Sequence, residues 1–107
     1  MTAALPAAEA GLPFYKLRLF ITGSTPRSTR AIDNLRRICA DNLDGRYELE
    51  VIDVYEHPET TREFQIVATP TLVKVLPEPL RKIIGDLSNE LKVLAGLDLA
   101  PRTDRED

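Results

Sequence analysis

The sequence predicts a single α/β domain with the element order strand, helix, strand, helix, strand, strand, helix. Three observations support this prediction. Residues 16–22 and 47–55 alternate polar and apolar side chains, which is typical of strands. Residues 26–43 repeat apolar side chains every three or four positions, which is typical of an amphipathic helix. A strand-helix-strand unit implies a parallel pair of strands, and 107 residues fit one domain.

The first helix has clear start and stop signals. Thr25 or Ser24 can cap it, and Pro26 fits its first turn because an amide hydrogen there has no helical partner. The sequence NLDG at 42–45 predicts a turn. The apolar stripe of the helix consists of Ala31, Leu35, Ile38, Cys39 and Leu43. The inward residues expected in the second strand are Leu49, Val51 and Val54.

The second half of the chain contains shorter elements. They are a helix from His57–Pro58 to about Val67, a strand at 71–76, a turn at 77–79, a hairpin partner at 80–85, and a helix at 88–97 capped by Ser88. The stretch 92–100 contains Gly96 and alternates from Ala95 to Leu99, so its pattern fits both a helix and a strand. Tertiary packing must therefore decide its structure.

Composition restricts the kinds of function. The net charge of −3 argues against a general nucleic-acid binder, and every apolar run is shorter than the ~20 residues of a membrane span. One cysteine excludes an intrachain disulfide and indicates a reducing, cytoplasmic location. We expect a flexible leader at 1–13, one domain at 14–100 and a disordered charged tail at 101–107.

No residue pattern predicts catalysis, a cofactor or a metal. The element order and the ATPTL at 68–72 resemble thioredoxin relatives, in which the bond before this proline is commonly cis. Where a redox pair C-x-x-C would follow the first strand, the chain has GSTP at 23–26. Cys39 lies on the apolar stripe, and His57 has no second ligand beside it. A thiol- or glutathione-dependent enzyme of thioredoxin-like fold remains the alternative, although the nucleophile it requires is missing.

Longer stretches resemble the KaiB family of circadian clock proteins. These stretches are GSTPRSTRA at 23–31, VIDVYEHPE at 51–59, ATPTLVKVLPEPLRKIIGDLS at 68–88 and KVLAGLDL at 92–99. The resemblance covers residues 15–99. Two departures are Glu50, where the cyanobacterial pattern has lysine, and Pro101, where it has tyrosine.

The resemblance implies a fold-switching regulator that is not an enzyme. Members of this family alternate between a tetramer of order βαββααβ and a thioredoxin-like monomer of order βαβαββα. The monomer binds the amino-terminal ring of KaiC, a hexameric ATPase, and thereby modulates its phosphorylation and ATPase cycle. The implied further partners are a KaiA-like activator, a sensor histidine kinase and copies of the chain itself, as a homotetramer or dimer.

The resemblance and the charge pattern also suggest roles for individual residues. The basic residues expected to form a patch for an acidic partner are Arg18, Arg30, Lys74, Arg81 and Lys82. The resemblance places Tyr15, Gly96 and Asp98 where substitutions in relatives shift the balance between the two folds. Pro70, Pro77 and Pro79 lie in the segment that would refold, and we expect isomerisation at one or more of them to slow the switch.

Overall fold

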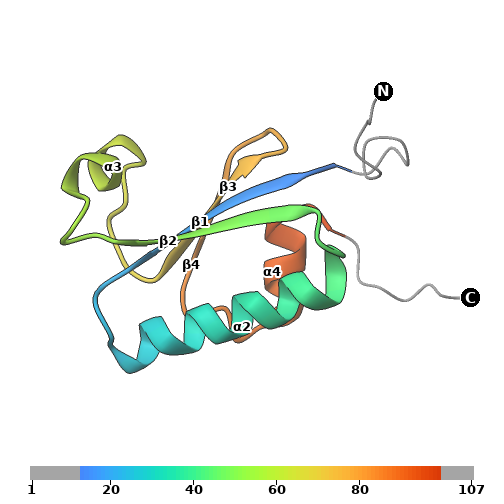
Figure 1. The fold of residues 1–107 in the computed structure, drawn as a ribbon, viewed down its shortest axis with the longest axis horizontal. Coiled ribbons are helices and arrows are strands. Elements are labelled where there is room, and N and C mark those ends of the chain that lie inside the picture. Colours follow the sequence, from blue (N-terminus) through green and yellow to red (C-terminus); the bar gives the residue numbers. More distant parts are fainter. Residues whose placement is uncertain (1–12, 100–107) are drawn as a thin grey trace, which may run out of the picture.

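The structure, a computed structural model, describes residues 13–99 as a four-stranded sheet with three helices (Figure 1). The elements are β1 (Tyr15–Ile21), α2 (Pro26–Asn42), β2 (Tyr47–Asp53), α3 (Pro58–Glu63), β3 (Thr71–Leu76), β4 (Arg81–Ile84) and α4 (Glu90–Gly96). This order confirms the predicted strand, helix, strand, helix, strand, strand, helix sequence. The expected leader at 1–13 and tail at 101–107 lie almost entirely outside the described residues.

The sheet has the strand order β2-β1-β3-β4. The β1 and β2 strands are parallel, as the helical crossover between them requires. The β3 strand runs antiparallel to both β1 and β4, so the hairpin adds β4 at one edge. The other edge of the sheet is β2. None of the described helices is long and apolar enough to cross a membrane.

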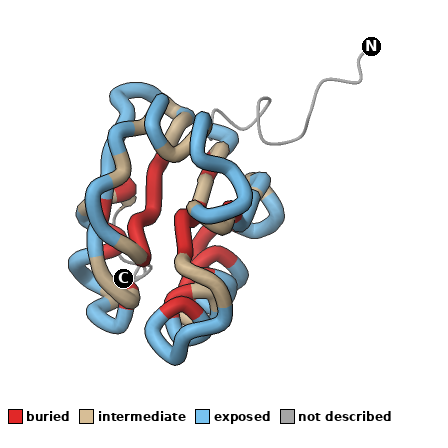
Figure 2. The backbone as a smooth tube through the Cα atoms, turned by 90° about the vertical axis from the view of Figure 1, so that its left-hand side faces the viewer, coloured by how far each residue is buried: buried red, intermediate tan, exposed pale blue. Residues whose placement is uncertain are grey.

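The main core lies between the sheet and the helices α2 and α4. All five residues predicted for the apolar stripe of α2 are fully buried there, together with Leu17 and Leu19 of β1 and Val93 and Leu94 of α4. Figure 2 shows this buried backbone as the red segments between the exposed outer loops. The long first helix is therefore fixed to the sheet by its apolar stripe, as its sequence pattern predicts.

A smaller cluster lies on the opposite face of the sheet. Phe20, Ile52 and Val73 are buried in it, and Phe64 and Ile66, which follow α3, pack against them. The α3 helix itself has six residues, none of them buried. This face is therefore covered mainly by the residues after the helix.

Three predictions about the elements are corrected. Val51 is 36% exposed, because β2 is an edge strand and the side chains on its outer part have no neighbouring element to pack against. The second helix ends at Glu63 instead of Val67, because Gln65 has a left-handed backbone with φ of 56°. Asn89, not Ser88, caps the last helix, since its side chain accepts a hydrogen bond from the backbone amide of Lys92.

The start of α2 gives a direct test of local folding. The Thr25 hydroxyl oxygen accepts a hydrogen bond from the Ser28 amide at 3.1 Å. We expect Thr25→Ala to lower the free energy of unfolding by about 0.5–2 kcal/mol, because the Ser28 amide loses its partner. Thr25→Ser should retain most of the stability in urea denaturation. Equal losses in the two variants would contradict the capping role.

Candidate functional site

The loop after β1 occupies the place where a thioredoxin-like enzyme would carry its reactive thiol. Here it is held by polar contacts instead. The Gly23 amide donates to Asp53 Oδ2 at 3.2 Å, and the Thr22 and Thr69 hydroxyls share a hydrogen bond. The Thr69–Pro70 peptide is cis, as the resemblance to thioredoxin relatives predicted. The loop is therefore fixed by polar contacts, and its residues 22–26 include no cysteine.

Cys39 cannot replace that sulfur in this fold. Its side chain is fully buried on the apolar stripe of α2, and burial raises the pKa of its thiol to about 12. A nucleophilic cysteine needs an accessible thiolate, which this environment strongly disfavours. Residues 13–99 also contain no group of three His, Cys, Asp or Glu side chains that could hold a metal ion.

The five basic residues predicted as one patch are divided between different surfaces. In the sheet, Arg18 and Lys82 both stand opposite Val73 and belong to the face of the smaller cluster. Lys74 and Arg81 are register partners on the opposite face. Arg30 lies on α2. The structure therefore brings together Arg18 with Lys82, and Lys74 with Arg81, but not all five.

Lys74 forms the centre of a compact ionic cluster. Its side chain is only 1% exposed, and its Nζ donates to Asp98 Oδ2 at 2.9 Å. Arg81 Nε approaches the same oxygen at 3.4 Å. Asp98 follows α4 and has a left-handed backbone with φ of 62°. The cluster fastens the chain after α4 to the β3–β4 hairpin. The charge pattern and the family resemblance indicated roles for Lys74, Arg81 and Asp98 separately, but they did not predict that the three side chains meet.

The ionic cluster lowers the pKa of the Asp98 carboxyl, chiefly through the hydrogen bond from Lys74. A carboxyl whose pKa is lower in the folded than in the unfolded chain stabilises the fold at pH values above the ordinary aspartate pKa. This stabilisation is lost as the pH falls through the pKa of the folded chain. We therefore expect Asp98→Asn to be less stable than the parent chain at pH 7. The difference in free energy of unfolding should shrink steadily from pH 5 to pH 2.

Urea denaturation at each pH measures this difference. Asp33→Asn is the matched control, because it removes an exposed aspartate of α2 that lies outside the ionic cluster. Its difference from the parent chain, measured at the same pH values, is the baseline for the Asp98→Asn result. A pH-independent difference for Asp98→Asn would contradict the assigned ion pair.

Arg18 contacts an aromatic ring as well as an acid. Its guanidinium carbon lies 5.1 Å from the centroid of the Phe64 ring, and its Nε lies 3.4 Å from Glu50 Oε1. This Nε is buried, and its approach to Glu50 is an ion pair without hydrogen-bond geometry. Arg18 therefore links the edge strand β2 to the segment after α3.

The residues expected to control fold switching differ in burial: Tyr15 and Pro70 are buried, Gly96 and Pro77 are partly buried, and Asp98 and Pro79 are exposed. Tyr15 is 2% exposed, and burial raises the pKa of its phenol. A Cβ added at Gly96 would lie 2.5 Å from Cδ1 and 2.7 Å from Cγ1 of Ile83, so that side chain would have to move. The bonds before Pro70, Pro77 and Pro79 are all cis.

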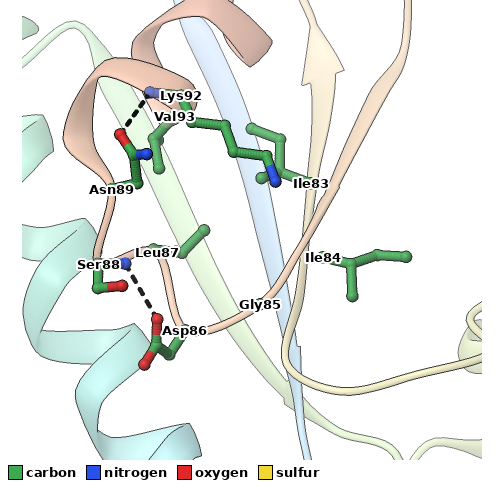
Figure 3. Close-up of a pocket in the computed structure, with 9 residues that line it drawn as sticks. All are labelled: Ile83, Ile84, Gly85, Asp86, Leu87, Ser88, Asn89, Lys92 and Val93. Carbon is green, nitrogen blue, oxygen red and sulfur yellow. Dashed lines mark hydrogen bonds between the residues drawn. The ribbon is translucent and has the colours of Figure 1, made fainter.

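The loop between β4 and α4 is tied to α2. Arg30 Nε donates to Asp86 Oδ2 at 3.3 Å, and Asn34 donates to the Asp86 carbonyl at 2.9 Å. Hydrogen bonds from Ser88, and then from Arg30, lower the pKa of Asp86. Beside this loop is an open pocket of about 120 Å³, along which the Lys92 side chain extends while Ile84 points away (Figure 3). Its small size and mixed lining do not indicate a cofactor site.

Comparisons with known proteins agree with this geometry. In solved structures the chain is similar to yeast mitochondrial thioredoxin 3, with a TM-score of 0.64, 21% identity, and coverage of 78% of this chain and 76% of that one. It is also similar to the N-terminal domain of Synechococcus elongatus SasA, with a TM-score of 0.66, 24% identity, and coverage of 88% and 90%. These likenesses establish the thioredoxin-like fold.

Sequence relatives give the family. The chain is 54% identical to the circadian clock protein KaiB3 of Synechocystis over 85 residues, which are 79% of this chain and 83% of the relative. It is 52% identical to the circadian clock oscillator protein KaiB of Microcystis aeruginosa over 92 residues, which are 86% and 88%. The family model described as the KaiB domain matches residues 18–99. With this family match over most of the chain and a thioredoxin-like sheet, the chain belongs to the KaiB family of circadian clock proteins.

Proposed function

We propose that the protein is a non-enzymatic regulator that binds a KaiC-type hexameric ATPase and modulates its phosphorylation and ATPase cycle. The family match over residues 18–99 is the observation that carries this proposal. The buried thiol of Cys39 supports the absence of redox catalysis. The site of action is the cytoplasm, and further partners are a KaiA-like activator and a sensor histidine kinase.

The thioredoxin-like form described above is the proposed binding form, and the proposed alternative is a βαββααβ homotetramer. The sizes of the elements support a switch confined to the second half. The first helix, α2, has 17 residues, whereas α3 has six and α4 has seven. Helices this short have little stability of their own, so packing decides their structure. Tyr15, Gly96, Asp98, Pro70, Pro77 and Pro79 are the proposed control residues.

Partner binding is assigned to the basic residues that the fold leaves accessible. Arg30 and Arg81 have half-exposed side chains, and Lys82 is exposed on the edge strand. Lys74 is buried against Asp98, so its proposed role is to support Arg81 from within the domain. Arg18 is proposed as a contact at the β2 side of the sheet.

Size-exclusion chromatography with a KaiC-type ATPase, with and without ATP, tests the proposed function. We expect a complex that forms slowly and requires nucleotide. Lys82→Glu should weaken it, whereas Arg62→Glu on α3 is the matched charge control. The absence of any complex, or thiol-disulfide activity in an insulin-reduction assay, would overturn the proposal.

Gly96 provides a test of the switch itself. Alanine favours a helix over other backbone structures by roughly 0.5–1 kcal/mol relative to glycine, but here its Cβ would press on Ile83. Ile83→Ala removes the two atoms that obstruct it. We therefore expect Gly96→Ala to accelerate complex formation more in the Ile83→Ala background than in the parent chain. Identical effects in both backgrounds would contradict the contact between these residues.

A further inference from the structure

The segment that carries α3 lies on the sheet with few buried side chains. We define the flap as residues 58–67, which comprise α3 and the residues that follow it. From Asp53 to Thr69 no residue is buried, and Figure 1 shows α3 at one end of the molecule, apart from α2 and α4. Segments with few buried contacts open locally at a lower free energy than the core of a domain. The flap is therefore expected to depend on a small number of anchoring contacts.

One hydrogen bond joins the flap to the sheet. Lys82 Nζ, from the edge strand β4, donates to the Gln65 carbonyl at 3.3 Å. Among the residues that the structure describes, the other hydrogen bonds of the flap run within it or to the adjoining His57. Gln65 has a left-handed backbone, which residues other than glycine seldom adopt without support from their surroundings. Lys82 therefore holds the flap at the turn after α3.

A second basic side chain holds the flap through an aromatic ring. The Arg18 guanidinium carbon lies 5.1 Å from the centroid of the Phe64 ring, which is a cation–π contact. Phe64 in turn packs against the buried Phe20 ring. Arg18 and Lys82 both stand opposite Val73 in the sheet, so they reach the flap from one row across β1 and β4. We call these two basic residues the clasp.

We propose that the flap is a hinged cover over the smaller cluster, and that the clasp of Arg18 and Lys82 controls its opening. Opening would uncover Phe20, Ile52 and Val73. The β3, β4 and α4 elements would keep their places, because neither the main core nor the ionic cluster contains a residue of the flap. This motion is therefore distinct from the proposed exchange with a tetramer, in which the second half of the chain refolds.

The clasp also gives partner binding a way to act on the flap, a step that rests on the proposed function. Lys82 is assigned to the complex with the ATPase, and a carboxylate of that partner would compete with the Gln65 carbonyl for its ammonium. An ammonium forms a stronger hydrogen bond with a charged acceptor than with a neutral one. Formation of the complex should therefore loosen the flap.

Amide hydrogen exchange, measured by NMR on the full-length chain, tests the role of the clasp. The Ile66 amide donates to the Thr61 carbonyl at 3.1 Å, and its protection should be about tenfold or more below that of the α2 amides. Lys82→Met removes the ammonium but keeps the apolar stem, so Ile66 protection should fall by a further factor of about three or more. Lys82→Arg should keep most of the protection. Protection of the α2 amides should stay within about twofold of the parent value in both variants.

Lys92→Met is the matched control, because it makes the same change on an exposed lysine of α4. It should leave Ile66 protection within about twofold of the parent value. Arg18→Met is a second variant, and loss of its contact with Phe64 should lower Ile66 protection about threefold or more. Three results would overturn the proposal: Ile66 protection equal to that of α2, equal effects of Lys82→Met and Lys92→Met, or an equal loss of protection throughout the domain.

Exchange of the peptide 58–67, measured by mass spectrometry with a KaiC-type ATPase and ATP, tests the coupling. Faster exchange of this peptide in the complex supports it, whereas unchanged or slower exchange contradicts it. If no complex forms, the proposed function fails, and the exchange of Ile66 in the free chain still decides whether the clasp holds the flap.

Discussion

Iodoacetamide is expected to modify Cys39 in the folded chain about a thousandfold more slowly than in the unfolded chain at pH 8. The reactive species is the thiolate, and burial raises the pKa of this thiol from 9.0 to about 12. Three pH units correspond to roughly a thousandfold smaller thiolate fraction. Full burial of the side chain adds a steric barrier. Mass spectrometry of the labelled chain, with and without denaturant, measures the ratio.

A transplanted thiol provides the positive control for this experiment. In a Cys39→Ser chain that also carries Ser24→Cys, the new thiol would stand in the exposed loop just before α2. A helix start lowers the pKa of a nearby thiol, so this cysteine should react rapidly without denaturant. Rapid labelling of Cys39 in the folded parent chain would contradict the assigned burial and would revive the enzymatic alternative.

The same shift predicts alkaline instability. Above pH 9 the unfolded chain loses the Cys39 proton while the folded chain retains it until about pH 12. Folding stability therefore declines as pH rises through this interval.

Phe20→Ala is expected to reduce the free energy of unfolding by about 3–5 kcal/mol, the usual loss for a buried aromatic ring. Phe20 is fully buried, and its ring centroid lies 5.8 Å from that of Phe64. The substitution would remove the centre of the smaller cluster. Because small domains have only roughly 5–15 kcal/mol of stability, a substantial unfolded fraction should appear.

Urea denaturation measures this loss. The free energy of unfolding should fall with urea concentration at the same slope as in the parent chain, as expected if unfolding remains two-state. Phe14→Ala is the control, because this phenylalanine is 44% exposed at the start of the described chain. Its effect should be within about 0.5 kcal/mol. A loss below about 1 kcal/mol for Phe20→Ala would mean that the smaller cluster contributes little to folding.

The sequence was sufficient to predict those helices and strands that are specified by neighbouring residues. The α2 helix has a capping threonine, a proline in its first turn and a stripe of side chains that all face the sheet. Its predicted end differs from the observed end by one residue. For β2 the alternation was correct, but Val51 is exposed because the pattern cannot reveal which strand lies at the edge.

The candidate site depends on contacts between distant parts of the chain, which the sequence pattern does not contain. A lysine in an apolar strand gives no sign that its ammonium will be buried. Lys74 is buried because Asp98, 24 positions later, turns back over the hairpin with a left-handed backbone. The five basic residues were grouped by their charge alone. Their division between the two faces follows from the register of β1, β3 and β4.

The surface position of α3 has an evolutionary consequence. None of its six residues is buried, and Phe64 and Ile66 make the apolar contacts beyond its end. Mutations between Pro58 and Glu63 would therefore leave the cores almost unaffected. This segment could diversify faster than the rest of the domain and acquire new specificities while folding stayed under the control of other residues.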